Sequence, residues 1–245
     1  MRIPRIHLDR PLAVGTELEL GREAGRHLLQ VLRLRHGQPL TLFNGDGRDY
    51  AAELLVAGKS ARAHISAARD NRSESPCRVT LVQAVSKGER MDYTLQKSVE
   101  LGVAAIRPVF SQRSVVRLDG ARLERKLLHW RGVIASACEQ CGRSRLPPLL
   151  PALELSAWLA DGGRERGERE LLLAPDAPVG LGQIEPGGAS FTLLIGPEGG
   201  LAEAEIAAAR AAGFSAVRLG PRVLRTETAA LAALAVLQAR CGDLG

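Results

Sequence analysis

The stretch that decides the fold lies near the C-terminus and reads FTLLIGPEGGLAEAEIAAAR at residues 191–210 and SAVRLGPRVLRTETAA at residues 215–230. In each half a short apolar run leads into a glycine-bearing loop and then into an alanine-rich segment, a pattern typical of a buried strand followed by a helix. We expect strands at 191–195 and 216–219, helices at 201–209 and 229–239, and Thr226 as the N-cap of the second helix. Open α/β sheets bind ligands at such strand-end loops.

The two loops lack the sequences of the common nucleotide-binding loops. GPEGG at 196–200 matches neither the dinucleotide fingerprint nor the P-loop, and no lysine stands close by to meet a phosphate. Glycines instead let the backbone approach a flat or folded small molecule closely. One such loop could equally be a tight turn, but two of them, the second carrying RTET at 225–228, favour a binding site.

Together, LIGPEGG at 194–200 and LGPRVLRTETA at 219–229 resemble the RsmE family of ribosomal RNA methyltransferases, which belongs to the SPOUT class. Further similar segments are VLRLRHG at 31–37, KGER at 87–90 and QKSVELGV at 96–103, and the pattern of Glu139, Gln140 and Arg143. The chain departs from the family pattern at Gln112, where the family usually has an acid, and at Cys141, where it usually has a serine.

The resemblance implies an α/β SPOUT-type fold, a trefoil-knotted parallel sheet with flanking helices, preceded by a small PUA-like β-barrel domain that binds RNA. The expected boundaries are 1–70 for the barrel, 71–76 for a linker and 77–245 for the methyltransferase domain. It also implies S-adenosylmethionine as cofactor and a homodimer with the site near its interface. The implied reaction is methylation of N3 of one uridine, by family convention uridine 1498, in 16S ribosomal RNA of the small ribosomal subunit.

The chemistry of this reaction and the resemblance together give candidate site residues. Uracil N3 is a poor nucleophile while it carries its proton, so the enzyme must remove the proton or stabilise the anion that spreads onto O2 and O4. A carboxylate or an arginine can do this, and the candidates are Arg225, Glu198 and Glu139. Apolar side chains can sandwich adenine while loop amides bond its edge, and the candidates for cofactor binding are Leu172, Ile195, Gly196, Pro197, Gly199, Gly200, Leu219, Gly220, Val223, Leu224 and Thr226.

Positive charge is concentrated in the middle of the chain. The formal net charge is +6; residues 76–146 carry 13 basic and 6 acidic side chains, whereas residues 147–245 carry 8 and 12. A cationic surface beside a small-molecule site suits an enzyme that acts on RNA, although an ordinary solvated surface has the same composition. The candidate RNA contacts are Arg5, Arg10, Arg33, Arg35, His36, Lys87, Arg90, Arg113 and Arg143.

The order of predicted elements separates two regions. Alternating runs at 17–20, 39–43, 50–56 and 61–65, with a short helix at 23–32 and the turn signal NGDG at 44–47, predict a small barrel. A strand at 78–85, a helix ending at Leu101 and a strand at 105–110 predict a βαβ unit and a parallel sheet.

A long helix is predicted for residues 123–141, where apolar side chains recur every three or four positions. Trp130 lies on that apolar face, so we expect it in the core rather than stacked on an RNA base. Cys138 and Cys141 have the spacing of a metal or redox pair, but no second pair completes four ligands, so we predict structural thiols and no metal.

The sequence also indicates where in the cell the protein works. There is no apolar run of membrane-spanning length and no signal-peptide segment at the start, so we expect no membrane association, reduced thiols and a cytoplasmic location.

Two other functions remain open. The same architecture could carry out another methylation, such as ribose 2′-O methylation, although the combined pattern of residues 97–103, 139–143 and 222–229 argues against it. A non-catalytic RNA-binding or ribosome-assembly protein is the other alternative, against which the intact glycine loops argue.

Overall fold

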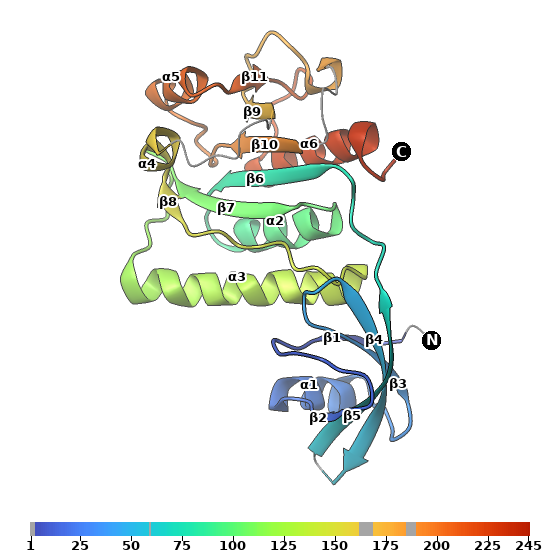
Figure 1. Ribbon diagram of the computed structural model, residues 1–245. Coiled ribbons are helices and arrows are strands. Elements are labelled where there is room, and N and C mark those ends of the chain that lie inside the picture. Colours follow the sequence, from blue (N-terminus) through green and yellow to red (C-terminus); the bar gives the residue numbers. More distant parts are fainter. Residues whose placement is uncertain (1–2, 59, 162–168, 185–189) are drawn as a thin grey trace. The chain divides into compact units, whose positions relative to one another are not determined.

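The computed structural model, shown in Figure 1, describes residues 3–58, 60–161, 169–184 and 190–245. These residues form two compact units. The N-terminal unit comprises residues 1–74 and 138–146, and the C-terminal unit comprises residues 75–137 and 147–245. The chain therefore changes unit between Glu74 and Ser75, and residues 138–146 return to the N-terminal unit, which the boundaries expected from the sequence do not include.

The N-terminal unit is built on a five-stranded sheet with the strand order β1-β3-β4-β5-β2. Its longest pair is the antiparallel hairpin of β4 (Arg48–Ala57) and β5 (Ser60–Asp70). The antiparallel strand β3 (Pro39–Phe43) enters β4 through the predicted turn at 44–47, while β1 (Arg5–His7) pairs parallel with β3 and β2 (Glu17–Glu19) antiparallel with β5. The short helix α1 (Arg22–Arg26) continues into one π-helical turn, η1 (His27–Val31).

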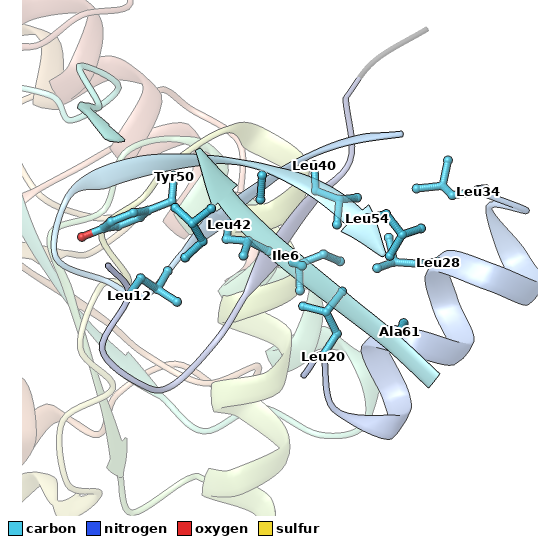
Figure 2. Close-up of a cluster of buried hydrophobic side chains, with 13 residues drawn as sticks. Ile6, Leu12, Leu20, Leu28, Leu34, Leu40, Leu42, Tyr50, Leu54 and Ala61 are labelled. Atoms are coloured by element: carbon cyan, nitrogen blue, oxygen red, sulfur yellow. The ribbon is translucent and has the colours of Figure 1, made fainter. Parts of the chain in front are cut away.

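Figure 2 shows the buried apolar side chains that form the core of this unit. Alternate side chains of the strands are buried, as the period of two in a half-buried strand requires. Leu40 and Leu42 come from β3, Leu54 from β4, and Leu28 from the helical segment packs against them. A register shift between Ala51 and Ala52 bends β4, a feature that local sequence did not indicate.

The C-terminal unit contains a six-stranded, entirely parallel sheet, as the sequence predicted. The strand order is β11-β9-β10-β6-β7-β8. Its strands are β6 (Arg78–Ala84), β7 (Ala105–Phe110), β8 (Leu153–Glu154), β9 (Arg169–Leu173), β10 (Ser190–Ile195) and β11 (Ser215–Val217). The fully buried side chains of Leu193 and Leu194 show that β10 is covered on both faces.

Helices cover this sheet. They are α2 (Glu89–Glu100), α3 (Gly120–Cys141), α4 (Leu155–Ala160), the 3₁₀ turn η2 (Leu181–Gln183), α5 (Glu203–Ala211) and α6 (Thr226–Cys241). Helix α6 packs on β6, β10 and α2, whereas α4 and α5 pack together with Trp158 in an edge-on contact with Phe214. Trp130 of α3 is fully buried and donates its indole N–H to Asp92 at 3.0 Å, which confirms it as a core residue.

The prediction of Thr226 as an N-cap is wrong. Helix α6 begins at Thr226, so the N-cap position belongs to Arg225, which makes no side-chain capping bond. The Thr226 hydroxyl instead donates to the carbonyl oxygen of Gly196 at 2.6 Å. A local sequence rule assigned the hydroxyl to its own helix, whereas the fold uses it to join the two glycine loops.

None of the helices in the described ranges combines the length and apolar character that crossing a bilayer requires. The trefoil knot implied by the family resemblance stays a prediction.

Candidate active site

Three neighbouring parallel strands of the C-terminal unit end at one edge of the sheet. β9, β10 and β11 end at Leu173, Ile195 and Val217, and the loops that follow them line a cavity of about 550 Å³. The first turn of α6, Arg90 of α2 and Ile206 of α5 complete the wall. A cavity of this size at the carboxyl edge of a parallel sheet is typical of a small-molecule site.

Most residues predicted to bind the cofactor line this cavity. We call residues 196–200 the first glycine loop and residues 219–225 the second glycine loop. Predicted residues on the wall are Ile195, Gly196, Pro197, Gly200, Leu219, Gly220, Val223, Leu224 and Thr226. The other two lie beside it: Leu172 is fully buried in β9, and Gly199 is turned toward Arg113.

The loop after β9 also lines the cavity, and sequence reasoning missed it. Leu173, Ala174, Pro175 and Asp176 form this part of the wall. The segment has no glycine motif, and only its position after an apolar run could have indicated it. Because β9 lies between β10 and β11 in the sheet, its loop must emerge between the two glycine loops.

Glycine is required in the first glycine loop for two different reasons. A Cβ atom on Gly196 would lie 3.0 Å from the backbone nitrogen of Leu201, so the loop is packed against its own return. Gly200 has a φ of +68°, which L side chains rarely adopt. Its N–H donates to the Pro197 carbonyl at 2.9 Å and closes the turn.

Glu198 fastens the first glycine loop to the start of α2. Its Oε1 accepts the backbone N–H of Lys87 at 3.0 Å and an Nη1–H of Arg90 at 2.8 Å. Partial burial opposes the charge, but these hydrogen bonds and the Arg90 charge prevail and lower the pKa of Glu198. The carboxylate is therefore ionised, and its Oε1 is already hydrogen-bonded; we call its contacts with Arg90 and the Lys87 N–H the Glu198 clamp. Both cations were predicted RNA contacts: the Arg90 side chain takes part in the clamp, whereas the Lys87 side chain stays exposed.

Arg113 supports the same loop from another side. Its guanidinium donates to the Gly199 carbonyl at 3.0 Å. The neighbouring Gln112, where the family usually has an acid, uses its backbone N–H to bind Glu205 of α5 at 2.7 Å and leaves its side chain exposed. The segment after β7 thus contacts the first glycine loop through the Arg113 guanidinium and helix α5 through the Gln112 backbone.

Arg225 is exposed on the cavity wall immediately before α6. Within the described ranges it forms no ion pair; the nearby Glu227 instead approaches Arg90, with 3.9 Å between Oε1 and Nε. The guanidinium of Arg225 is therefore available to a bound molecule.

The other predicted site residues belong to the N-terminal unit. Glu139 accepts the backbone N–H of His7 at 2.9 Å, and burial raises its pKa in spite of that bond. Arg143, only 5% exposed, pairs with Glu74 through two hydrogen bonds; burial opposes its charge, but the pairing prevails and raises its pKa. Arg5 is paired with Asp49 at 3.0 Å and donates to the Arg143 carbonyl at 3.2 Å and to the Ser144 hydroxyl at 2.7 Å. Arg5 and Arg143 therefore hold residues 138–146 on the barrel.

Four predicted RNA contacts of the N-terminal unit are exposed. Arg33 and Arg35 follow η1, and Arg33 has the positive φ of 54° that turns the chain there. The ring of His36 accepts the N–H of Val56 through Nδ1 at 3.1 Å, and Arg10 donates to the Glu19 carbonyl. The charges of Arg33 and Arg35 are thus presented to solvent.

The cysteines are all free thiols. Burial raises the pKa of Cys138 to about 12, so this thiol is neutral at physiological pH. Among the described residues, no group of three or more histidine, cysteine, aspartate or glutamate side chains is arranged to hold a metal ion.

Known proteins resemble the chain over both units. A family model described as an RNA methyltransferase domain matches residues 73–238, and one described as an RNA methyltransferase PUA domain matches residues 20–65. A ribosomal RNA small subunit methyltransferase E from Buchnera aphidicola subsp. Schizaphis graminum is 32% identical over 99% of this chain and 98% of its own length.

Two solved structures are similar over the full length of both chains. A ribosomal RNA small subunit methyltransferase E from Neisseria gonorrhoeae, bound to S-adenosyl methionine, is 42% identical with a TM-score of 0.92. A methyltransferase from Legionella pneumophila, in complex with the same cofactor, is 40% identical with a TM-score of 0.93.

The fold therefore places the chain in the SPOUT class of RNA methyltransferases, enzymes that take their methyl group from S-adenosylmethionine. Since the similarity extends through both units, the assignment can be narrower. The chain belongs to the ribosomal RNA small subunit methyltransferase E family, as the loop sequences indicated.

Proposed function

We propose that the cavity between the two glycine loops binds S-adenosylmethionine and that the chain methylates N3 of one uridine, uridine 1498 by family convention, in 16S ribosomal RNA. The observation that carries this proposal is the convergence of nine predicted cofactor residues on one cavity, with Arg225 exposed on its wall. The relative from Neisseria gonorrhoeae, which is similar over the full length of both chains, was solved with that cofactor.

The residues of the cavity fit such a cofactor. An adenosine needs a flat apolar slot with backbone groups at its edge, and Ile195, Leu219 and Leu224 supply apolar wall beside exposed loop backbone. Tight packing at Gly196 leaves no room for a side chain there, so backbone forms this part of the wall.

When bound, the sulfonium cofactor supplies a methyl group that is already activated for transfer. The chain must then make uracil N3 nucleophilic and hold it in line. Arg225 is our candidate for stabilising the uracil anion, because its guanidinium is exposed, lines the cavity and makes no ion pair in the described part of the chain. Glu198 holds the loop: its charge is fixed in the clamp with Arg90 and the Lys87 N–H.

Glu139 is our candidate for accepting the N3 proton. A carboxyl whose pKa is raised by burial is better matched to proton transfer near neutral pH than one whose pKa is lowered. Comparing the pH profile of methyl transfer for wild type and Glu139→Gln tests this role. Loss of the acidic limb of the profile supports it, and an unchanged profile would remove Glu139 from the chemistry.

For the RNA we propose contact through exposed cations, chiefly Arg33, Arg35 and the Lys87 side chain, since phosphate binding needs accessible charge. The assembled small subunit as substrate, a homodimer that completes the site and a cytoplasmic reaction belong to the same proposal. Arg33→Ala with Arg35→Ala should weaken RNA binding and flatten its salt dependence while leaving cofactor affinity intact.

The reaction is tested by transferring labelled methyl groups to small ribosomal subunits that lack the modification, with nucleosides identified by mass spectrometry. We expect 3-methyluridine at a single position, and less transfer to naked 16S RNA. A 2′-O-methylated nucleoside in its place would contradict the proposed reaction.

A further inference from the structure

A fully buried glutamine adjoins two residues of the cavity wall, Ile195 and Thr226. Gln83 is the penultimate residue of β6, in register with Ile195, the last residue of β10. Its Nε2 donates to the Thr226 hydroxyl at 3.0 Å and to the Ala84 carbonyl at 3.0 Å. Gln83 is therefore joined to the first residue of α6, although 143 positions separate the two in sequence.

The direction of these hydrogen bonds is fixed by the Thr226 hydroxyl. A hydroxyl carries a single proton, and that of Thr226 goes to the Gly196 carbonyl at 2.6 Å. The other partner of the hydroxyl must then be a donor, which places the amide nitrogen of Gln83 there. The relay Gln83–Thr226–Gly196 thus joins β6, the start of α6 and the first glycine loop.

Packing alone does not account for an amide at this position. The Oε1 atom of Gln83 is buried without a hydrogen-bond partner among the described residues. An unpaired buried polar atom is costly, so an apolar side chain of similar shape would serve a purely structural role better. What the amide supplies here is the donor for Thr226.

We propose that Gln83 is a positioning residue for cofactor binding, acting through Thr226 to fix the Gly196 carbonyl and the start of α6 on the cavity wall. This inference rests on the proposed placement of S-adenosylmethionine in the cavity. Gly196 and Thr226 both line it, and Gly196 lies too close to Leu201 to adapt freely. Fixing both segments before binding lowers the ordering cost that the cofactor would otherwise have to overcome.

The chain offers a matched control in Gln238. This glutamine is also fully buried and lies on helix α6, as Thr226 does. Its amide donates to the carbonyls of Cys77 and Gly102 at 3.3 and 3.2 Å. It does not belong to the cavity wall. If Gln83 merely stabilises the fold, Gln83→Met and Gln238→Met will behave alike.

The test uses the full chain. It measures the Kd for S-adenosylmethionine by calorimetry, the KM for S-adenosylmethionine and kcat with small subunits as methyl acceptor, and the Tm of the cofactor-free protein. For Gln83→Met we expect Kd and KM for the cofactor to rise about tenfold, because one hydrogen bond of the buried relay is lost. At saturating cofactor, kcat should fall less. Gln238→Met should lower Tm and leave Kd near the wild-type value.

Thr226 variants keep the test informative even where Gln83→Met folds poorly. Thr226→Val removes the hydroxyl and should raise Kd to a similar extent, and Thr226→Ser should recover most of that loss. In the double variant of Gln83→Met and Thr226→Val the two effects should not add, because both break one relay. Fully additive effects, or equal rises in Kd for Gln83→Met and Gln238→Met, would overturn the proposal.

A cavity-filling variant separates this inference from the placement of the cofactor. Leu224→Trp occupies the cavity, whereas Leu128→Trp adds the same bulk at an exposed position of α3. Unchanged cofactor affinity in Leu224→Trp would contradict the placement itself. Lost affinity in Leu224→Trp together with unchanged affinity in Gln83→Met would contradict the relay alone.

Discussion

The two glycine loops border the same cavity but are held in different ways. The first glycine loop is fixed by its internal turn, by the Glu198 clamp, by Arg113 and by the Thr226 hydroxyl. In the described part of the chain, no side-chain hydrogen bond or ion pair holds residues 219–225, and Val223 is 83% exposed. One loop is therefore a preorganised wall, and the other presents side chains to whatever binds.

This difference assigns separate tasks to similar sequences. Residues that build the wall should affect cofactor affinity and folding, because a loosened loop must be ordered again on binding. In the second glycine loop, apolar side chains such as Leu224 should contact the cofactor directly, whereas the exposed Arg225 should affect the methyl-transfer step. The variants below test that division, beginning with the largest expected effect.

Arg225→Ala should have the largest effect on catalysis. Loss of a cation at developing charge typically lowers kcat by about 100-fold or more, and we expect a cofactor Kd close to that of wild type. Single-turnover methyl transfer measures the step directly. Arg210→Ala, at an exposed arginine of α5 away from the cavity, is the matched control; equal activity in the two variants would remove Arg225 from the chemistry.

Glu198→Ala should act mainly on binding. Removing the acceptor of two charge-assisted hydrogen bonds, one of them an ion pair with Arg90, should raise the cofactor Kd about tenfold and kcat should change less. Glu203→Ala removes an exposed acid of α5 and serves as control. A large fall in kcat with unchanged Kd would instead return Glu198 to the chemical step.

The clamp also predicts a pH dependence of stability. The pKa of Glu198 is lower in the folded than in the unfolded chain, so its contribution is present above the unfolded pKa, about 4.3, and is lost as the pH falls through the folded pKa. The free energy of unfolding should therefore be higher for wild type than for Glu198→Gln at neutral pH, and the difference should shrink in acid. Urea titrations at several pH values measure it; a difference that grows on acidification would contradict the clamp.

Gly220→Ala should have the smallest effect. Gly220 has a φ of +72° and open space where a Cβ would lie, so the cost is backbone strain alone, about 1 kcal/mol of unfolding free energy. Gly196→Ala should lose more cofactor affinity, since its Cβ meets the Leu201 backbone. If the two variants bind the cofactor equally well, the first glycine loop is not the more rigid wall.

Much of this fold was predictable because its signals are local. Apolar runs followed by glycine loops indicated β10 and β11, the strand–helix–strand order of residues 78–110 indicated the parallel sheet, and the turn at 44–47 indicated the β3–β4 connection. The apolar face of 123–141 placed Trp130 in the core. Nine of the residues proposed for cofactor binding could be gathered in one place because loops at one end of a parallel sheet meet at one edge.

What the sequence could not show depends on contacts between distant positions. The Arg143–Glu74 pair and the hydrogen bonds from Arg5 to the Arg143 carbonyl and the Ser144 hydroxyl join residues 138–146 to the N-terminal unit, and nothing local marks them. Thr226 satisfied an N-cap pattern, yet its hydroxyl binds Gly196. Gln83 carried no motif, and only its hydrogen bond to Thr226, 143 positions away in the sequence, reveals it.

The measurement that tests the account most directly is a crystal structure of the chain grown with S-adenosylmethionine. We predict electron density for the cofactor in the cavity between the glycine loops, with the first loop unchanged and residues 219–225 moved onto the ligand. Density at another site, or a first loop rebuilt on binding, would contradict the division between a fixed wall and a contacting loop.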